Sequence, residues 1–136
     1  MYVKRIVEDN WSGARNNGSE YGCNDIMQVV AAIKHLNGRT KTEVHFEADG
    51  EKSFSVGGGN DGRYVAFITI GFDDEFYNLV DLRQPKGQDL DVITGGQRGT
   101  FAPKQVVDLE TVLEAARQFA LDGGMAPALT WEKQQE

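Results

Sequence analysis

The run at residues 64–70 constrains the fold more than any other feature, because as a β-strand it is apolar on both faces. A strand covered on both sides has such a sequence, whereas an edge strand or a half-exposed strand avoids it. The chain therefore contains a β-sheet, and we predict that this run forms its middle strand. Its sequence is Tyr64-Val65-Ala66-Phe67-Ile68-Thr69-Ile70.

The segment 42–56 predicts a β-hairpin, because apolar and charged residues alternate along it on either side of Asp49 and Gly50. The loop length decides the register, since a two-residue turn would place Phe54 on the charged face. We predict an odd loop at residues 48–50 with Gly50 in the left-handed conformation. This loop puts Phe54 beside Val44 and Phe46.

The first residues predict a strand followed by a long loop. Residues 2–7 are β-branched and short enough for a strand, while residues 10–22 are rich in Asn, Gly and Ser. Two aromatic residues, Trp11 and Tyr21, lie in this predicted loop. Their rings either cap the core or serve as anchors for a partner.

The second half of the chain predicts three more strands. Residues 73–75 are expected to turn the chain into a strand at 76–80, pairing Phe72 with Phe76. Residues 90–93 predict a further strand. Residues 100–107 predict an edge strand, because Pro103 cannot donate to a sheet ladder.

Two helices complete the predicted fold. Asn24 caps the first, whose apolar residues continue at helical spacing to Leu36 before Asn37-Gly38 stops it. Asp108 caps the second, which Gly123-Gly124 ends. We predict one α+β domain over residues 1–136, with two main helices on a mostly antiparallel, twisted sheet of about six to seven strands. Residues 133–136 are predicted to form a frayed tail.

The net charge and the cysteine content limit the partners and the compartment that we expect for this chain. The formal net charge of −7 repels phosphate backbones and anionic lipids, so neither nucleic acid nor a membrane is an expected direct partner. The same charge would steer a basic protein toward this surface. Cys23 is the single cysteine, so the chain can form no internal disulfide, which favours a cytosolic protein.

The glycine string Gly57-x-Gly59-x-x-Gly62 has the spacing of a dinucleotide-binding loop. That chemistry needs a helix N-terminus directly after the loop, and here a strand follows. A kinase-type loop would need a lysine where the chain has Ile68. We therefore interpret the string as a connection that needs positive φ angles.

The charged face of the 42–56 hairpin is the main candidate for catalysis or metal binding. Glu43, His45 and Glu47 would project from one face of a strand, which permits a metal or acid–base site. The solvent face of an ordinary amphipathic strand has the same alternation, so we predict no metal site. The serines Ser12, Ser19, Ser53 and Ser55 are predicted to lack a converging histidine and acid.

Several segments together resemble the Imm-one immunity protein family of bacterial polymorphic toxin systems. The resemblance rests on the glycine loop before the 64–70 strand, the strand at 76–81 and the segment Ile93-Thr94-Gly95-Gly96-Gln97. It also rests on Val106-Val107-Asp108-Leu109-Glu110-Thr111, which opens an alanine-rich helix, and on Trp131-Glu132 near the end. These segments cover most of residues 54–132.

The resemblance implies a cytosolic α+β protein that has no catalytic residues and blocks a cognate toxin, often a nucleic-acid deaminase or nuclease. It implies structural roles for Trp131 and the Gly95-Gly96 turn. We expect no cofactor and no metal, and a monomer or a 1:1 complex with the toxin.

Two hypotheses of function remain open. In the first, acidic and aromatic side chains occupy or border the basic substrate cleft of the toxin. The candidate contacts are Asp61, Asp73, Asp74, Glu75, Tyr77 and Trp11. In the second, the chain is an enzyme or a small-molecule binder that uses a pocket beside the sheet, with Glu43 and His45 as its polar groups.

Overall fold

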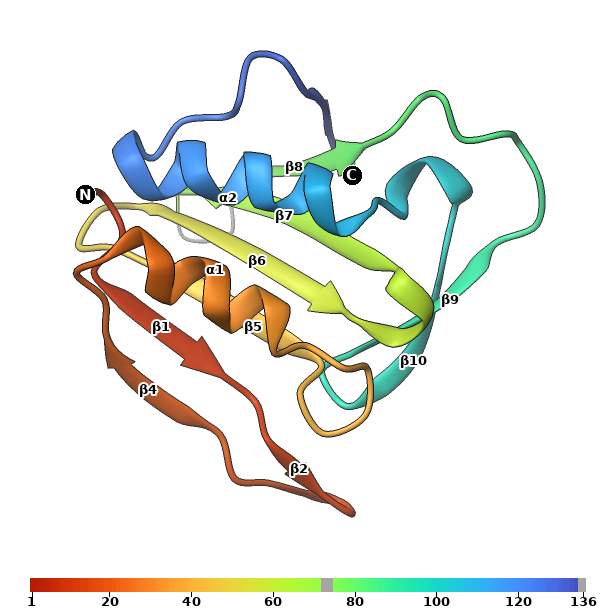
Figure 1. Ribbon diagram of the computed structural model, residues 1–136. Helices are drawn as coiled ribbons and strands as arrows, with labels where there is room; N and C mark the ends of the chain where they lie inside the picture. The colour runs from red at the N-terminus through yellow and green to blue at the C-terminus, as the bar shows by residue number, and fades with distance from the viewer. Residues whose placement is uncertain (72–74, 135–136) are drawn as a thin grey trace.

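The computed structural model describes residues 1–71 and 75–134 and has an α+β fold, as predicted (Figure 1). Two helices lie on one face of a seven-stranded sheet in which every neighbouring pair is antiparallel. The strand order is β11-β8-β7-β6-β5-β1-β4. Their bounds are β1 (Arg5–Glu8), β4 (Ser19–Gly22), β5 (Glu43–Glu47), β6 (Lys52–Gly58), β7 (Tyr64–Ile70), β8 (Glu75–Val80) and β11 (Thr130–Lys133).

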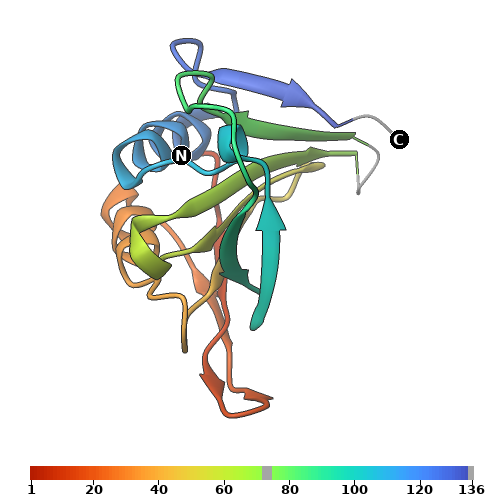
Figure 2. The same ribbon diagram turned by 90° about the vertical axis from the view of Figure 1, so that its right-hand side faces the viewer.

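Two short hairpins extend from this sheet. One pairs β2 (Trp11–Ser12) with β3 (Arg15–Asn16), and the other pairs β9 (Leu90–Thr94) with β10 (Gln97–Phe101). Two short 3-10 helices, η1 (Asn60–Gly62) and η2 (Pro103–Gln105), sit in the connections. The β9–β10 hairpin lies on the side of the sheet opposite the helices (Figure 2). It therefore covers part of a face that the helices leave open.

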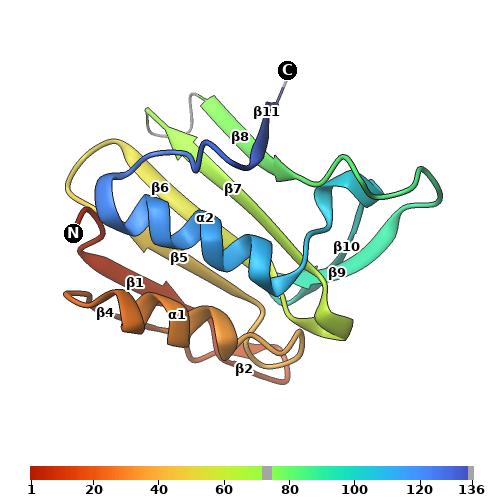
Figure 3. The same cartoon turned by 45° about the horizontal axis from the view of Figure 1, so that its top comes forward.

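The helices lie side by side over the sheet (Figure 3). Helix α2 (Leu109–Asp122) begins at the predicted cap Asp108 and ends at Gly123, which has a φ of 77°. Helix α1 (Ile26–Lys34) is capped by Asp25 and not by Asn24 as predicted. Asp25 is the cap because Gln28 lies three residues later, which is the spacing that a capping box needs, and its side chain accepts from the backbone N–H of Asp25. No helix in the described part of the chain is long and apolar enough to cross a membrane.

The core lies between the helices and the sheet and is centred on Phe54, which is fully buried. Its ring centroid lies 6.2 Å from that of Phe46, 5.6 Å from that of Phe119 and 6.5 Å from that of Trp131. The hairpin register pairs Phe46 with Phe54, so the predicted face is correct. The turn is centred one residue later than predicted, and Gly50 has no positive φ. This register makes the two large rings direct cross-strand neighbours.

The prediction for β7 is correct in outline. Its two neighbours are β6 and β8, and the central strand by order is β6. Ile68 is buried on the helix side, and Val65 packs with Val92 and Val106 on the other side. The strand is therefore covered on both faces over its first half.

The sheet edges differ most from the prediction. Residues 10–22 were predicted as a loop but form β2, β3 and β4, and β4 pairs with β1. The predicted tail begins with Lys133, which instead ends β11 and pairs with Tyr77. In both places the backbone completes a ladder on an open edge; the side chains of β4 are exposed, whereas Trp131 in β11 packs against the core.

Two further strand predictions need correction. Phe76 pairs with Thr69 and Glu75 with Ile70, so Glu75 belongs to β8 and not to the preceding loop. Phe72, Asp73 and Asp74 lie outside the described residues. The strand predicted at 100–107 is wrong over most of its length: β10 spans Gln97–Phe101 and ends there because Pro103 starts η2.

Candidate functional site

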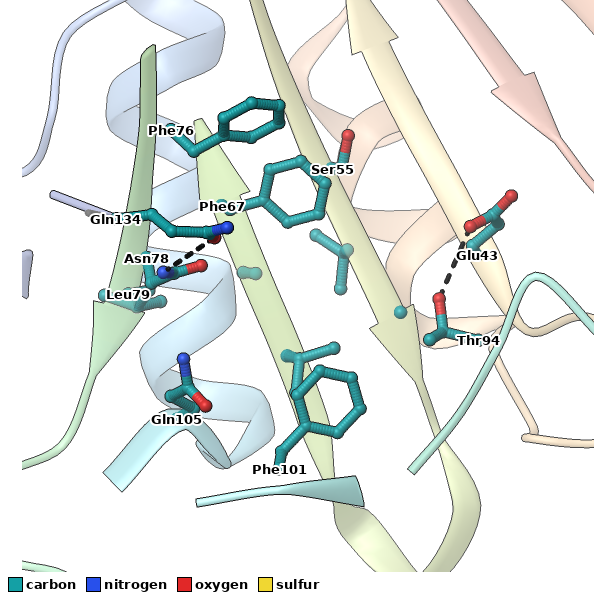
Figure 4. A pocket seen from close by; sticks show the side chains of 14 residues that line it. Glu43, Ser55, Phe67, Phe76, Asn78, Leu79, Thr94, Phe101, Gln105 and Gln134 are labelled. Atoms are coloured by element: carbon teal, nitrogen blue, oxygen red, sulfur yellow. Dashed lines mark hydrogen bonds between the residues drawn. The ribbon is translucent and has the colours of Figure 1, made fainter. Parts of the chain in front are cut away.

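The sheet face without helices, hereafter the helix-free face, carries a pocket of about 440 Å³. Its lining includes three aromatic rings, three side-chain amides and one carboxylate (Figure 4). The strands β5 to β8 supply most of this lining, and the β9–β10 hairpin supplies one wall. A pocket of this size falls within the range of small-ligand sites. The aromatic rings are those of Phe67, Phe76 and Phe101, the amides are those of Asn78, Gln105 and Gln134, and the carboxylate is that of Glu43.

Gly57 allows the β9–β10 hairpin to approach the sheet. A Cβ at this position would lie 2.6 Å from Cβ of Thr94, so any side chain would push the hairpin away. Asn60 fixes the same strand, β9, since its Oδ1 accepts from the N–H of Ile93 at 3.0 Å. The segment that contains the glycine string therefore holds the β9–β10 hairpin in place as a wall of the pocket. Gly58, Gly59 and Gly62 have the predicted positive φ angles.

A buried polar network anchors the turn of the same hairpin. The carboxylate of Asp9, which is 4% exposed, accepts from Nε1 of Trp11 at 2.8 Å and from the backbone N–H of Thr42 at 2.8 Å. It also accepts from the Thr42 hydroxyl and from the N–H of Glu43 at 3.1 Å. Gly96 donates its N–H to Oγ1 of Thr42 at 2.9 Å. All of these bonds except the one from Trp11 join segments that are distant in sequence, and the bond from Trp11 fixes its ring beside Asp9.

The Trp11 indole covers the Gly95-Gly96 turn. A Cβ on Gly96 would lie 2.5 Å from Cε2 of Trp11, and Gly96 has a φ of 76°. The turn therefore needs glycine for both its conformation and its contact. Trp11 is half-buried and packs against the chain itself.

Glu43, His45 and Ser55 form a chain of polar side chains on the helix-free face. His45 Nε2 lies 3.4 Å from Oε1 of Glu43, and His45 Nδ1 lies 2.7 Å from Oγ of Ser55. The prediction that no serine has a converging histidine and acid is therefore wrong for Ser55. The register His45↔Ser55 brings them together, and single-sequence reasoning about serines missed this cross-strand pair.

The Glu43–His45 pair favours the charged form of each group. The hydrogen bond to Glu43 raises the pKa of His45 above its ordinary value, and burial opposes this shift. The hydrogen bond to His45 lowers the pKa of Glu43, again against burial. As an imidazolium, His45 donates to Glu43 through Nε2 and to Ser55 through Nδ1. An anionic carboxylate therefore stands at one end of the pocket.

Glu47 faces the same way but has a different partner. Its Oε1 lies 3.7 Å from Nε of Arg5, and it is not part of the pocket lining. Among the described residues, no group of three His, Cys, Asp or Glu side chains is placed to hold a metal ion.

The predicted contact residues lie in separate places. Asp61 lies in η1, exposed and with a φ of 54°, before the start of β7. Glu75 lies beside the other end of β7, where its carboxylate contacts Nζ of Lys133 at 3.0 Å and accepts from the Tyr77 hydroxyl at 2.9 Å. Asp73 and Asp74 lie outside the described residues. The structure thus brings Glu75 and Tyr77 together but leaves Asp61 at the far end of the strand.

The fold and the pocket define a small α+β protein with a hollow on its open sheet face. The family model of Immunity protein Imm1 matches residues 24–133. This match covers most of the chain, so the chain belongs to the Imm1 immunity protein family, the Imm-one family that its motifs resemble. The match excludes β1 to β4, which include Trp11. A comparison with the curated proteins found no match.

Proposed function

We propose that this immunity protein neutralises a cognate toxin that acts on nucleic acid, such as a deaminase or a nuclease, by binding over its basic substrate cleft. Family membership over residues 24–133 is the observation that carries the proposal. The net charge of −7 supports it, because a toxin that binds nucleic acid presents a basic groove. Opposite charge speeds capture and makes it depend on salt.

The contact surface that we propose is the helix-free face together with the acidic groups at both ends of β7. The strand has seven residues and spans roughly 23 Å. A standard interface covers about 800 Å² on each partner, or a patch roughly 30 Å across. One bound toxin can therefore cover the pocket and reach Asp61 at one end and Glu75 at the other. We propose Asp73 and Asp74, which precede Glu75 in the sequence, as further contacts. Tyr77 and Trp11 would contact it at the border.

We place this binding in the bacterial cytosol, where the single cysteine would remain a thiol. Cys23 is buried and free, and burial raises the pKa of its thiol. The neutral thiol is a poor nucleophile.

The test is co-expression with the product of the neighbouring upstream gene, followed by co-purification and a growth-rescue assay. We expect a 1:1 complex and full rescue by the wild-type chain. Reversing charge at Asp61 and Asp74 together should slow association and flatten its salt dependence. Charge reversal at Asp74 alone is compared with charge reversal at Glu114, which is exposed on α2 and makes an equal change in net charge. Full rescue and unchanged binding after both reversals would refute the acidic contact surface.

A second candidate function follows from the Ser55–His45–Glu43 chain beside the pocket. The order serine, histidine and acid is that of a hydrolase triad. However, Ser55 lies in the middle of β6 between two paired strands, where backbone N–H groups serve the sheet ladder and not an oxyanion. Turnover of ester or amide substrates that is lost in both His45→Ala and Ser55→Ala would establish the enzyme. Equal background rates in all three proteins would exclude this chemistry for those substrates.

A further inference from the structure

Two neighbouring side chains orient the carboxylate of Glu43 at the edge of the pocket, and it can still accept hydrogen bonds from a ligand. Its Oε1 lies 3.4 Å from Nε2 of His45. Its Oε2 accepts from Oγ1 of Thr94 at 3.4 Å, as Figure 4 shows. A carboxylate offers about four acceptor positions, so two remain. The side chain is 33% exposed, and a ligand in the pocket can therefore reach it.

The rest of the pocket combines aromatic faces with amide oxygens. The rings of Phe67 and Phe76 lie with centroids 5.9 Å apart at an interplanar angle of 48°, and Phe101 closes the pocket from β10. Asn78 donates to Oε1 of Gln134 at 3.5 Å, which leaves the Asn78 carbonyl oxygen free of that bond. Aromatic faces attract cations, and amide oxygens accept hydrogen bonds from them.

We propose that this pocket receives an arginine side chain of the cognate toxin, which pairs with Glu43 and stacks on Phe67. The inference rests on the proposed function, because it names one contact of that complex. A guanidinium fits best because it is planar, stacks on aromatic rings and can bond a carboxylate through two N–H groups. The ammonium of lysine is more strongly hydrated and loses more on entering an apolar pocket.

Other acids on the same face are less suited to this role. Arg5 lies against Glu47, and Nζ of Lys104 lies 2.9 Å from Oε1 of Glu132. Glu43 also has a partner, His45, but of these three acids it is the one that lines the pocket, where the exclusion of water strengthens a charge pair. Arginine anchors of this kind are enriched among interface residues that carry most of the binding energy.

The first test needs no toxin. N-acetyl-arginine amide is titrated into the protein and followed by NMR, with N-acetyl-citrulline amide as a neutral probe of the same shape. We expect shifts of Phe67, Phe101 and the Asn78 amide with arginine, and about tenfold weaker binding of citrulline. Glu43→Gln should remove this preference, while Glu47→Gln, the same change on the same strand and face, should keep it. Equal binding of the two probes, or shifts located elsewhere, would overturn the proposal.

The second test uses the toxin and separates the two proposals. Glu43→Gln and Phe67→Leu should each weaken toxin binding by about tenfold or more, with Glu47→Gln close to wild type. Thermal unfolding of each variant verifies that it is folded. If the toxin binds wild type and both pocket variants equally, the pocket contact is wrong and the immunity function stands. If the wild type captures no toxin, the proposed function fails, and the probe titration still decides whether the pocket selects a guanidinium.

Discussion

Gly96 donates its backbone N–H to Oγ1 of Thr42 at 2.9 Å, across 54 residues of sequence. The Thr42 hydroxyl in turn donates to the buried carboxylate of Asp9. Three segments meet at this point: the end of β1, the entry to β5 and the turn of the β9–β10 hairpin. The network therefore holds one wall of the pocket against the sheet.

Gly96→Ala should destabilise the protein by about 3 kcal/mol or more, because the new Cβ would meet the Trp11 ring and the backbone is left-handed. Gly62→Ala is the matched control. Gly62 has a φ of 69° and open space around its Cβ position, so its variant should lose only about 1–2 kcal/mol. Urea unfolding measures both, and equal losses would show that the Trp11 contact contributes nothing.

Asp9→Ala should cost about 3 kcal/mol, because it leaves the buried donors of Thr42 and Trp11 without an acceptor. Asp9→Asn should lose less but not recover wild-type stability, since its amide NH₂ faces other donors. Asp89→Ala, at an exposed acid, should stay within about 0.5 kcal/mol of wild type. A stable Asp9→Ala protein with an intact hairpin would contradict the role of the network.

The strands and helices of the centre were predictable because their apolar residues repeat with clear periods. Residues 64–70 and the α2 segment carry that signal in their own sequence. The edge strands β4 and β11 carry no such repeat: all four side chains of β4 are exposed, and β11 contributes one side chain, Trp131, to the core. Local propensity could not predict ladders whose hydrogen bonds depend on a neighbouring strand.

His45 should titrate above its ordinary value of 6.5 in NMR experiments, because the imidazolium donates to Glu43. Glu43→Gln should bring this pKa down toward 6.5, and Glu47→Gln should change it less, since Glu47 acts only at longer range. A wild-type value at or below 6.5 would show that the two side chains do not pair in solution.

The same pair predicts how stability depends on pH. The raised pKa of His45 gives stability that is complete below 6.5 and is lost as pH rises through the folded value. The lowered pKa of Glu43 gives stability that is complete above 4.5 and is lost as pH falls through the folded value. The unfolding free energy that Glu43→Gln removes should therefore be largest between about pH 4.5 and 6.5 and should shrink on either side. A difference independent of pH would contradict the ion pair.

Trp131→Ala should lose about 3 kcal/mol, because the indole packs on Phe54 and its Nε1 donates to the carbonyl of Ala126 at 3.2 Å. Trp131→Phe keeps an aromatic ring but loses the donor, so about 1 kcal/mol should be lost. Leu82→Ala, where the side chain is 62% exposed, serves as the control and should be nearly neutral. Equal stability of all three variants would remove the structural role that the family resemblance implies for Trp131.

The pocket was harder to predict from the sequence than the fold was. The sequence placed Glu43 and His45 on one exposed face, but the wall from β9–β10 depends on packing between distant segments. One local signal pointed to it: Gly57 within a strand marks a close approach of another chain segment. The Ser55 contact depends on the hairpin register, and the predicted centre of that turn was wrong by one residue.

The most direct test of stoichiometric inhibition is a titration of the toxin's activity with purified immunity protein at toxin concentrations well above the dissociation constant. Inhibition by binding predicts a linear loss of activity that ends at one equivalent, weakened as salt concentration rises. Complete inactivation by a small fraction of an equivalent would indicate catalysis, and no inactivation at several equivalents would contradict the account.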